Sequence, residues 1–180
     1  MSEIVQNVED AVLSLVMANE TAVLGSTLMQ GINFQYGHKR ELIETMMQWD
    51  KDPELRYQKY PLVYLVQDFK ETRGHDAGVY AQVGLNIIIA HQTTQSFKIT
   101  DRYLNVFKPV LYPIYYSLLN QMAVFSGILE GTEEMLEHDK WDRSYWGRAA
   151  IGGTEKMSLN DYVDAIEINN LSLKINLLNC

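Results

Sequence analysis

Apolar residues recur at helical spacing in two stretches of the chain. In residues 3–18 they form one stripe, made of Ile4, Val8, Ala11, Val12, Leu15 and Val16. In residues 102–122, RYLNVFKPVLYPIYYSLLNQM, steps of 100° gather Tyr103, Phe107, Val110, Leu111, Ile114, Leu118 and Met122 on one side. We predict an amphipathic helix over each stretch, and Thr100 as the N-cap of the second.

The second predicted helix contains two prolines, Pro109 and Pro113. A proline in a helix interior normally costs about 3 kcal/mol. Both prolines fall on the polar side, where water can hydrogen-bond the carbonyls of Asn105 and Pro109 that lose their donors. Two arrangements stay open: one bowed helix that wraps its apolar face around a core, or a break with Pro109 as the first residue of a new helix.

Strand patterns lie between and after these helices. Residues 32–37 alternate apolar and polar, 60–69 and 79–92 are rich in β-branched and aromatic residues, and 164–176 alternate again. A short helix is predicted over 39–50, and the polar loop 71–78 is too short for a parallel crossover, so 60–69 and 79–92 should pair antiparallel. The pattern predicts an α+β fold: a mainly antiparallel sheet with the long bowed helix and the N-terminal helix packed on one face.

Composition and charge narrow the function classes. The 180 residues suit one domain, and no apolar stretch reaches the length of about 20 residues that a membrane span needs, so no membrane partner is predicted. The single cysteine, Cys180, allows no internal disulfide. The net charge of −8 argues against a general phosphate-binding surface, although a local basic patch stays open.

Candidate catalytic chemistry is sparse. The four histidines lack metal-ligand spacing with one another, and phosphate-loop and nucleophile-elbow motifs are missing. The polar residues that an enzyme could use are Asp68, His75, His91 and Glu134, the last of which shares a helical face with His138. Asp68 is explained more simply by a sheet edge or an ion pair, His75 by a solvated loop and Glu134 by an exposed ion pair. We therefore predict no catalytic residue, no cofactor and no metal.

The segment 127–156 is charged and rich in aromatic residues, and its pattern predicts an irregular structure. It contains Trp141, Tyr145 and Trp146 together with Arg143 and Arg148. Tryptophan, tyrosine and arginine dominate the energies of protein–protein interfaces, so these five residues are the predicted contact surface. The alternative is that the segment folds back and buries its own rings.

The order of these elements resembles small bacteriophage connector proteins: the tail-terminator, tail-completion and neck-ring proteins between portal and tail. The likeness lies in INFQYG (32–37), KYPLVYLVQDF (59–69), the long strand after it and ITDRYLNVFKPVLYPIYYSLLNQM (99–122), followed by a closing strand. It covers about residues 30–122 most closely, and crAss-like phages are among the nearest groups. A departure from the compact members of this group is the irregular arm or loop at about 127–160.

The resemblance implies a non-enzymatic structural virion protein with one connector-like domain over residues 1–180. Such subunits form homo-oligomeric rings of six or twelve copies and contact the portal or other neck and tail proteins. They are made in the host cytoplasm and end in the neck or tail of the virion. DNA would pass through the lumen without specific binding, and the acidic net charge is compatible with this. The alternative function is a small cytosolic α+β enzyme or ligand-binding domain.

Overall fold

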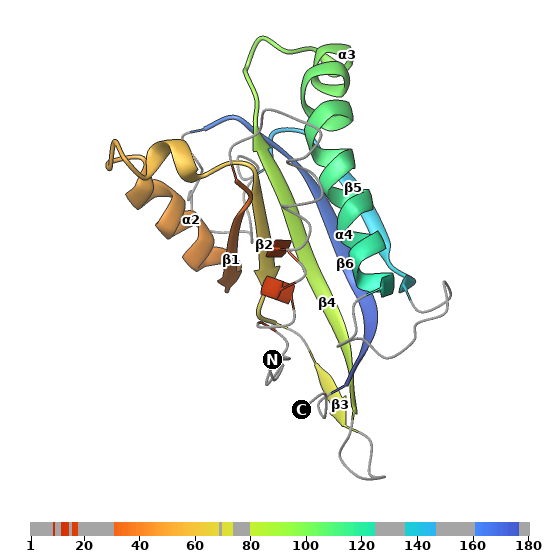
Figure 1. Cartoon of the computed structure of the whole chain (residues 1–180). Helices are drawn as coiled ribbons and strands as arrows, with labels where there is room; N and C mark the ends of the chain where they lie inside the picture. Colours follow the sequence, from red (N-terminus) through yellow and green to blue (C-terminus); the bar gives the residue numbers. More distant parts are fainter. Residues whose placement is uncertain are drawn as a thin grey trace.

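The structure is a computed structural model, and it describes residues 9, 12–14, 16, 17, 31–68, 70–73, 80–124, 136–146 and 161–176. Within these residues a six-stranded sheet is combined with helices (Figure 1), which confirms the predicted α+β fold class. The strands are β1 (Asn33–Gly37), β2 (Leu62–Val66), β3 (Glu71–Arg73), β4 (Tyr80–Gln92), β5 (Asp139–Arg143) and β6 (Val163–Asn176). The helical elements are α2 (Lys39–Trp49), η1 (Arg56–Gln58), α3 (Ile99–Arg102), η2 (Tyr103–Leu111) and α4 (Tyr112–Val124).

The main path of the sheet runs β1-β2-β4-β6-β5, and β3 pairs with β4 beside the end of β2. β2 and β4 pair antiparallel, as predicted, and β4–β6 and β5–β6 are antiparallel as well. β1 and β2 are parallel, because α2 provides the crossover that a parallel pair requires. All five residues of β2 are buried, which fits its position inside the sheet.

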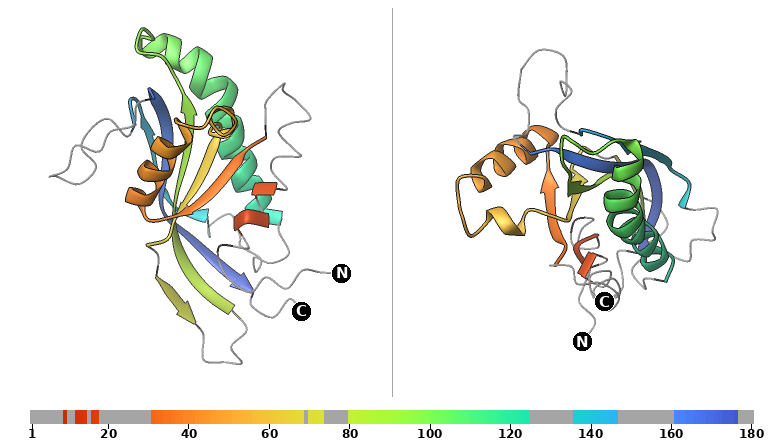
Figure 2. Two further views of the ribbon diagram at one scale, coloured as in Figure 1. Left: turned by 90° about the vertical axis from the view of Figure 1, so that its left-hand side faces the viewer. Right: turned by 90° about the horizontal axis from the view of Figure 1, so that it is seen from above.

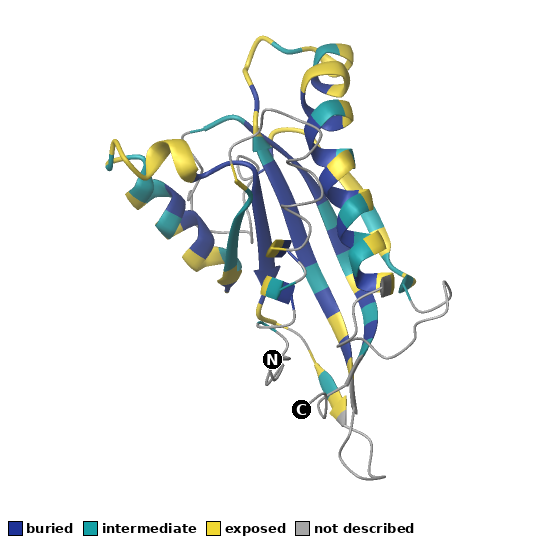
Figure 3. Ribbon diagram, viewed as in Figure 1, coloured by how far each residue is buried: buried dark blue, intermediate teal, exposed yellow. Residues whose placement is uncertain are grey.

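Each face of the sheet is covered by a different helix (Figure 2). The long helical segment packs on one face, where Val12 and Val16 of the N-terminal stretch join the same core as Leu111 and Ile114. This agrees with the prediction that both helices share a face. α2 covers the other face and buries Leu42, Ile43 and Met46 against β2, β4 and β6. The sequence pattern of α2 does not predict which face of the sheet this helix covers. Figure 3 shows the buried residues concentrated along the central strands and the inner sides of the helices.

α3, η2 and α4 follow one another without interruption, so the chain stays helical through both prolines. The middle part, η2, is a π-helix, in which the amide of Tyr112 donates to the carbonyl of Phe107 five residues earlier. The wider π-turn moves the carbonyl that a proline ring would strike in an α-helix, which explains how Pro109 is accommodated without a break. Pro113 is exposed and Pro109 is half-buried, so both lie toward solvent as the pattern indicated.

Two details of this helix differ from the prediction. Its N-cap is Lys98, whose backbone amide donates to the carboxylate of Asp101 at 3.0 Å, and Thr100 lies inside the first turn. Tyr103 was expected on the buried side but is 47% exposed. The π-helical register explains this second difference, because it rotates side chains away from the 100° step on which the expectation was based.

Two predicted irregular segments contain short strands. The loop 71–78 begins with β3, and the predicted irregular arm at 127–160 contains β5. Both strands pair with a long neighbour, β4 or β6, and tertiary pairing of this kind overrides the weak β-propensity of their charged residues. Among the described residues, no helix combines the length and apolar character that crossing a membrane requires.

Candidate protein-interaction site

The predicted contact residues Trp141 and Arg143 lie on β5, the last strand at one edge of the sheet. Trp141 is 52% exposed, and the guanidinium of Arg143 lies 4.7 Å from the centre of its indole ring. Arg143 also forms an ion pair with Glu167 of β6, with Nε 3.1 Å from the carboxylate oxygen. The two side chains therefore form one exposed aromatic and cationic unit.

Side chains on β5 alternate between the two faces of the sheet. Trp141 and Arg143 are opposite Glu167 and Ala165 of β6, and Ala165 belongs to the core beneath α2. Because opposite residues in an antiparallel pair share a face, Trp141 and Arg143 lie on the α2 face. Lys140 and Asp142 must then lie on the face of the long helix.

The tyrosines of the long helix hold Lys140 and Asp142 in place. The hydroxyl of Tyr112 donates to Asp142 at 2.8 Å, and the ammonium of Lys140 lies 4.9 Å from the centre of the Tyr112 ring. Burial, together with the hydrogen bond to Asp142, raises the pKa of Tyr112 to about 12. The hydroxyl of Tyr115 contacts His138 Nε2 at 2.8 Å just before the strand begins. β5 is therefore anchored to α4 on this face.

A buried ion pair fixes the chain immediately after β5. Asp164 and Arg102 form this pair, and their side chains are 0% and 3% exposed. The amide of Tyr145 donates to the Asp164 carboxylate at 3.1 Å, and the Tyr145 ring stacks 3.8 Å from the Arg102 guanidinium carbon. Tyr145 has a positive φ of 55°, which turns the chain back into the subunit. Tyr145, 38% exposed, therefore positions β5 and retains some surface for contact.

Trp146 is only 7% exposed and belongs to the core between α2 and the sheet. Its Nε1 donates to Glu167 at 2.9 Å. Trp146 therefore belongs to the interior of the subunit rather than to the predicted contact surface, and for this ring the alternative of self-burial holds. Arg148, the fifth predicted contact residue, lies outside the described residues.

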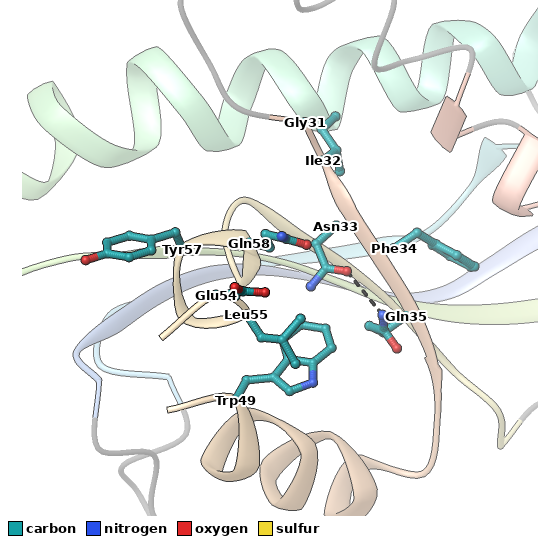
Figure 4. Close-up of a pocket in the computed structure, with 10 residues that line it drawn as sticks. All are labelled: Gly31, Ile32, Asn33, Phe34, Gln35, Trp49, Glu54, Leu55, Tyr57 and Gln58. Carbon is teal, nitrogen blue, oxygen red and sulfur yellow. Dashed lines mark hydrogen bonds between the residues drawn. The ribbon is translucent and has the colours of Figure 1, made fainter. Parts of the chain in front are cut away.

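A groove of about 800 Å³ lies at the opposite edge of the sheet, beside β1 (Figure 4). β1 contributes Asn33, Phe34 and Gln35, and the amide side chains of Asn33 and Gln35 are joined by a hydrogen bond of 3.1 Å. The other wall comes from the end of α2, the turn that follows it and η1, with Trp49, Glu54, Leu55, Tyr57 and Gln58. Tyr57 is 72% exposed and Leu55 36%, so this edge also presents apolar surface.

The backbone of β1 also has hydrogen-bonding groups that point away from β2. The amide of Asn33 donates to Pro61 and the carbonyl of Gly37 accepts from Gln67, so these residues face β2. Because successive residues of a strand face opposite neighbours, the backbone groups of Phe34 and Tyr36 face outward. No described strand pairs with this side of β1. The alternating pattern of residues 32–37 predicts the strand but not its position at an edge, since strand order is a tertiary property.

A second pocket, of about 760 Å³, lies near the end of β4. Lys59, Tyr60, His91 and Asp161 are among its lining residues. Lys59 is 2% exposed and forms ion pairs with Asp50 and Asp161, so its charge is already balanced inside the subunit. Burial lowers the pKa of His91, and its Nδ1 has no hydrogen-bond partner among the described residues. This pocket is the place where the alternative, a ligand-binding domain, would have its centre.

The other residues of the enzyme alternative do not join His91 there. Asp68 is exposed and follows the far end of β2, because Val66 is opposite Asn86 while His91 lies five residues further along β4. At about 3.3 Å per residue this separates Asp68 from His91 by roughly 20 Å. His75 and Glu134 lie outside the described residues. In the part of the chain that the structure describes, no group of three or more potential metal ligands is found.

No protein-family model, curated protein or solved structure matches this chain.

Proposed function

We propose that this chain is a structural subunit of a bacteriophage virion, a ring-forming head–tail connector or tail-completion protein. The observation that supports the proposal best is the position of β1 and β5 at opposite ends of the strand order, each without a second strand neighbour among the described residues. Both edges carry exposed aromatic side chains, Tyr36 at 55% and Trp141 at 52%. Two different surfaces on opposite sides of a subunit favour head-to-tail contacts, which form a ring when the rotation between neighbouring subunits closes.

The charge of the chain is compatible with this role. A channel for DNA functions best when its wall does not hold the phosphates, and a chain with a net charge of −8 offers little counterion release on contact with DNA. The sequence resemblance supplies the rest of the proposal: six or twelve copies, contact with the portal or other neck and tail proteins, and a final location in the neck or tail of the virion.

Electron microscopy tests the proposal. The purified protein is imaged alone and mixed with the portal and tail proteins of the same virion. We expect rings in at least the mixed sample, because a connector that is monomeric alone can assemble on its neighbours. Dispersed monomers in both samples would contradict the proposal.

The alternative function, a small enzyme or ligand-binding domain, is favoured only by the pocket that contains His91. Its test is a nuclear magnetic resonance titration in which small anions and metabolites are added while the imidazole signals are followed. Saturable shifts of the His91 signals, lost in a His91→Gln variant, would support this alternative over a purely structural role.

A further inference from the structure

We infer that neighbouring copies of this chain continue one sheet, with β5 of one copy paired antiparallel to β1 of the next. This inference rests on the proposed function and specifies the contact that would build the ring. The occupant of the groove beside β1 is therefore a second copy of the chain, and four features of the structure support that choice.

The first feature is strand direction. β1 is parallel to β2, and each later neighbour along β2-β4-β6-β5 is antiparallel to the one before it. β5 therefore runs opposite to β1. A rotation about an axis roughly parallel to the strands preserves this relation between copies, so β5 of one copy meets β1 of the next as an antiparallel pair.

The second feature is the backbone pattern. On β6 the carbonyl of Val163 accepts from Trp146 while that of Tyr162 accepts from Thr93 of the β4 side, so odd-numbered residues of this stretch face β5. Trp141 and Arg143 are opposite the odd-numbered Glu167 and Ala165, and they therefore face β6. The backbone groups of Lys140 and Asp142 must point to the open side.

These outward groups match those of β1. An antiparallel register that pairs Phe34 with Asp142 and Tyr36 with Lys140 uses the outward backbone groups of both strands. The same register places Gln35 opposite Trp141 and Asn33 opposite Arg143 as non-hydrogen-bonded pairs, whose side chains are closest. A slip by one residue would turn every side chain to the other face.

The third feature is the match of the faces. Asn33 and Gln35 are opposite Leu62 and Tyr64, which belong to the α2 core, so they lie on the α2 face. Trp141 of the next copy lies on the same face and would enter the groove beside Trp49 (Figure 4). Its own subunit leaves it 52% exposed, while the groove of about 800 Å³ has room for an indole ring.

The fourth feature is charge. Arg143 accompanies Trp141 on β5, and Glu54 is an acidic residue in the wall of the groove. The register brings Arg143 opposite Asn33, which lines the same groove. β5 itself carries four charged residues out of five, DKWDR, whereas β1 carries none. A charged edge strand disfavours pairing with strands that lack complementary groups. β5 should therefore select a partner that presents an acidic and an aromatic side chain, as Glu54 and Trp49 do in the groove.

Disulfide trapping tests the register. In a Cys180→Ser background, Asn33→Cys and Arg143→Cys are combined, because non-hydrogen-bonded partners have Cα atoms about 4.5 Å apart, within the range for a disulfide. The matched control combines Asn33→Cys with Lys140→Cys, which the register places on opposite faces. Both proteins are oxidised at high concentration and under the conditions that give rings, and then separated on non-reducing gels.

We expect the first pair to give a ladder of covalent multimers and the control pair to give at most a trace. Rings without a ladder from the first pair would overturn the inferred contact and leave the proposed function standing. Absence of both rings and ladder would count against the proposed function and the contact together. Equal ladders from both pairs would also overturn the register.

Two variants test the contact without cysteines. Tyr36→Pro removes an outward amide that bonds to no described strand, so the subunit should fold while the added pairing is lost. Trp141→Ala removes the anchor. Each variant is compared with the parent under the conditions that give rings, and we expect association of the subunits at least about tenfold weaker in sedimentation velocity. Tyr116→Ala, at an exposed position of α4 (58%), is the control and should associate like the parent. Unchanged association of Tyr36→Pro and Trp141→Ala would refute the contact.

Discussion

Neutralising Asp164 provides the sharpest test of how the β5 edge is held. The Asp164→Asn substitution keeps the shape of the side chain but removes the carboxylate that balances Arg102. The guanidinium donates four hydrogen bonds: to the carboxylate itself, to Thr93 Oγ1 at 3.4 Å, to the Phe97 carbonyl at 3.1 Å and to the Thr94 carbonyl at 3.1 Å. Only the first of these is charged, so the substitution leaves a buried cation among neutral acceptors.

The loss of stability in Asp164→Asn can be estimated from the burial of the ion pair. Arg102 and Asp164 are 3% and 0% exposed, and breaking such a pair from one side costs about 3–5 kcal/mol. The amide of Tyr145 can still donate to an asparagine carbonyl, so we add nothing for that bond. For a chain of this size, about 2–4 °C per kcal/mol predicts a melting temperature lower by roughly 6–20 °C.

Urea unfolding followed by tryptophan fluorescence and by circular dichroism measures the change, with coincidence of the two signals as the check for two-state behaviour. Glu44→Gln is the control: it breaks the Arg40–Glu44 pair, whose side chains are 61% and 46% exposed, and should cost no more than about 0.5 kcal/mol. A loss of unfolding free energy below about 1 kcal/mol for Asp164→Asn would refute the reasoning, because an unbalanced charge that stays buried destabilises the folded state by more than that.

Three further predictions concern stability. Trp146→Ala should lower the free energy of unfolding in urea by about 3–5 kcal/mol, because the Trp146 ring is 7% exposed. Trp141→Ala should change it by no more than about 0.5 kcal/mol, because Trp141 is exposed. Equal losses for the two variants would contradict the assignment of Trp146, and not Trp141, to the core. Gly37→Ala should lower the free energy of unfolding by about 1–3 kcal/mol, since the φ of Gly37 is +142° and an added Cβ would lie 2.8 Å from a carboxylate oxygen of Glu41. Gly84→Ala should be neutral or stabilising, because an added Cβ there has nothing within 4 Å. Similar melting curves for the two variants would refute this prediction. Burial lowers the pKa of His91 in the folded state, so at pH values between that lowered pKa and the ordinary histidine pKa near 6.5 the unfolded state binds more protons. The free energy of unfolding should therefore fall as pH falls through this interval. A His91→Gln variant should show a shallower pH dependence of stability, and an unchanged slope would contradict the prediction.

The sequence alone was sufficient to predict the type and position of the helices and strands that have a strong hydrophobic periodicity. The continuous apolar run around β2 and the alternation of β1 and β6 identified these strands, and the spacing of Phe107 to Met122 identified the buried side of the long helix. These patterns succeed because burial of one face or stripe is a local constraint that every residue of the element must satisfy. The same logic placed the prolines toward solvent.

Local patterns could not identify β5. Its sequence, DKWDR, has no apolar alternation, and the strand exists because β6 offers it a partner and because Tyr112 and Asp164 anchor its surroundings. The π-helical register of η2, which exposes Tyr103, likewise depends on how a proline-containing helix packs on a sheet.

The tertiary structure also decided which aromatic residues remain for contact. Trp141 and Trp146 are five residues apart in a segment of uniform character, yet one is exposed and the other lies in the core. Sequence could predict that the segment carries interface-type residues, since residue type is local. Only the strand order could show that β5 and β1 are the two edges of the described sheet, because an edge is defined by which strands lie beside it, and folding brings those strands together.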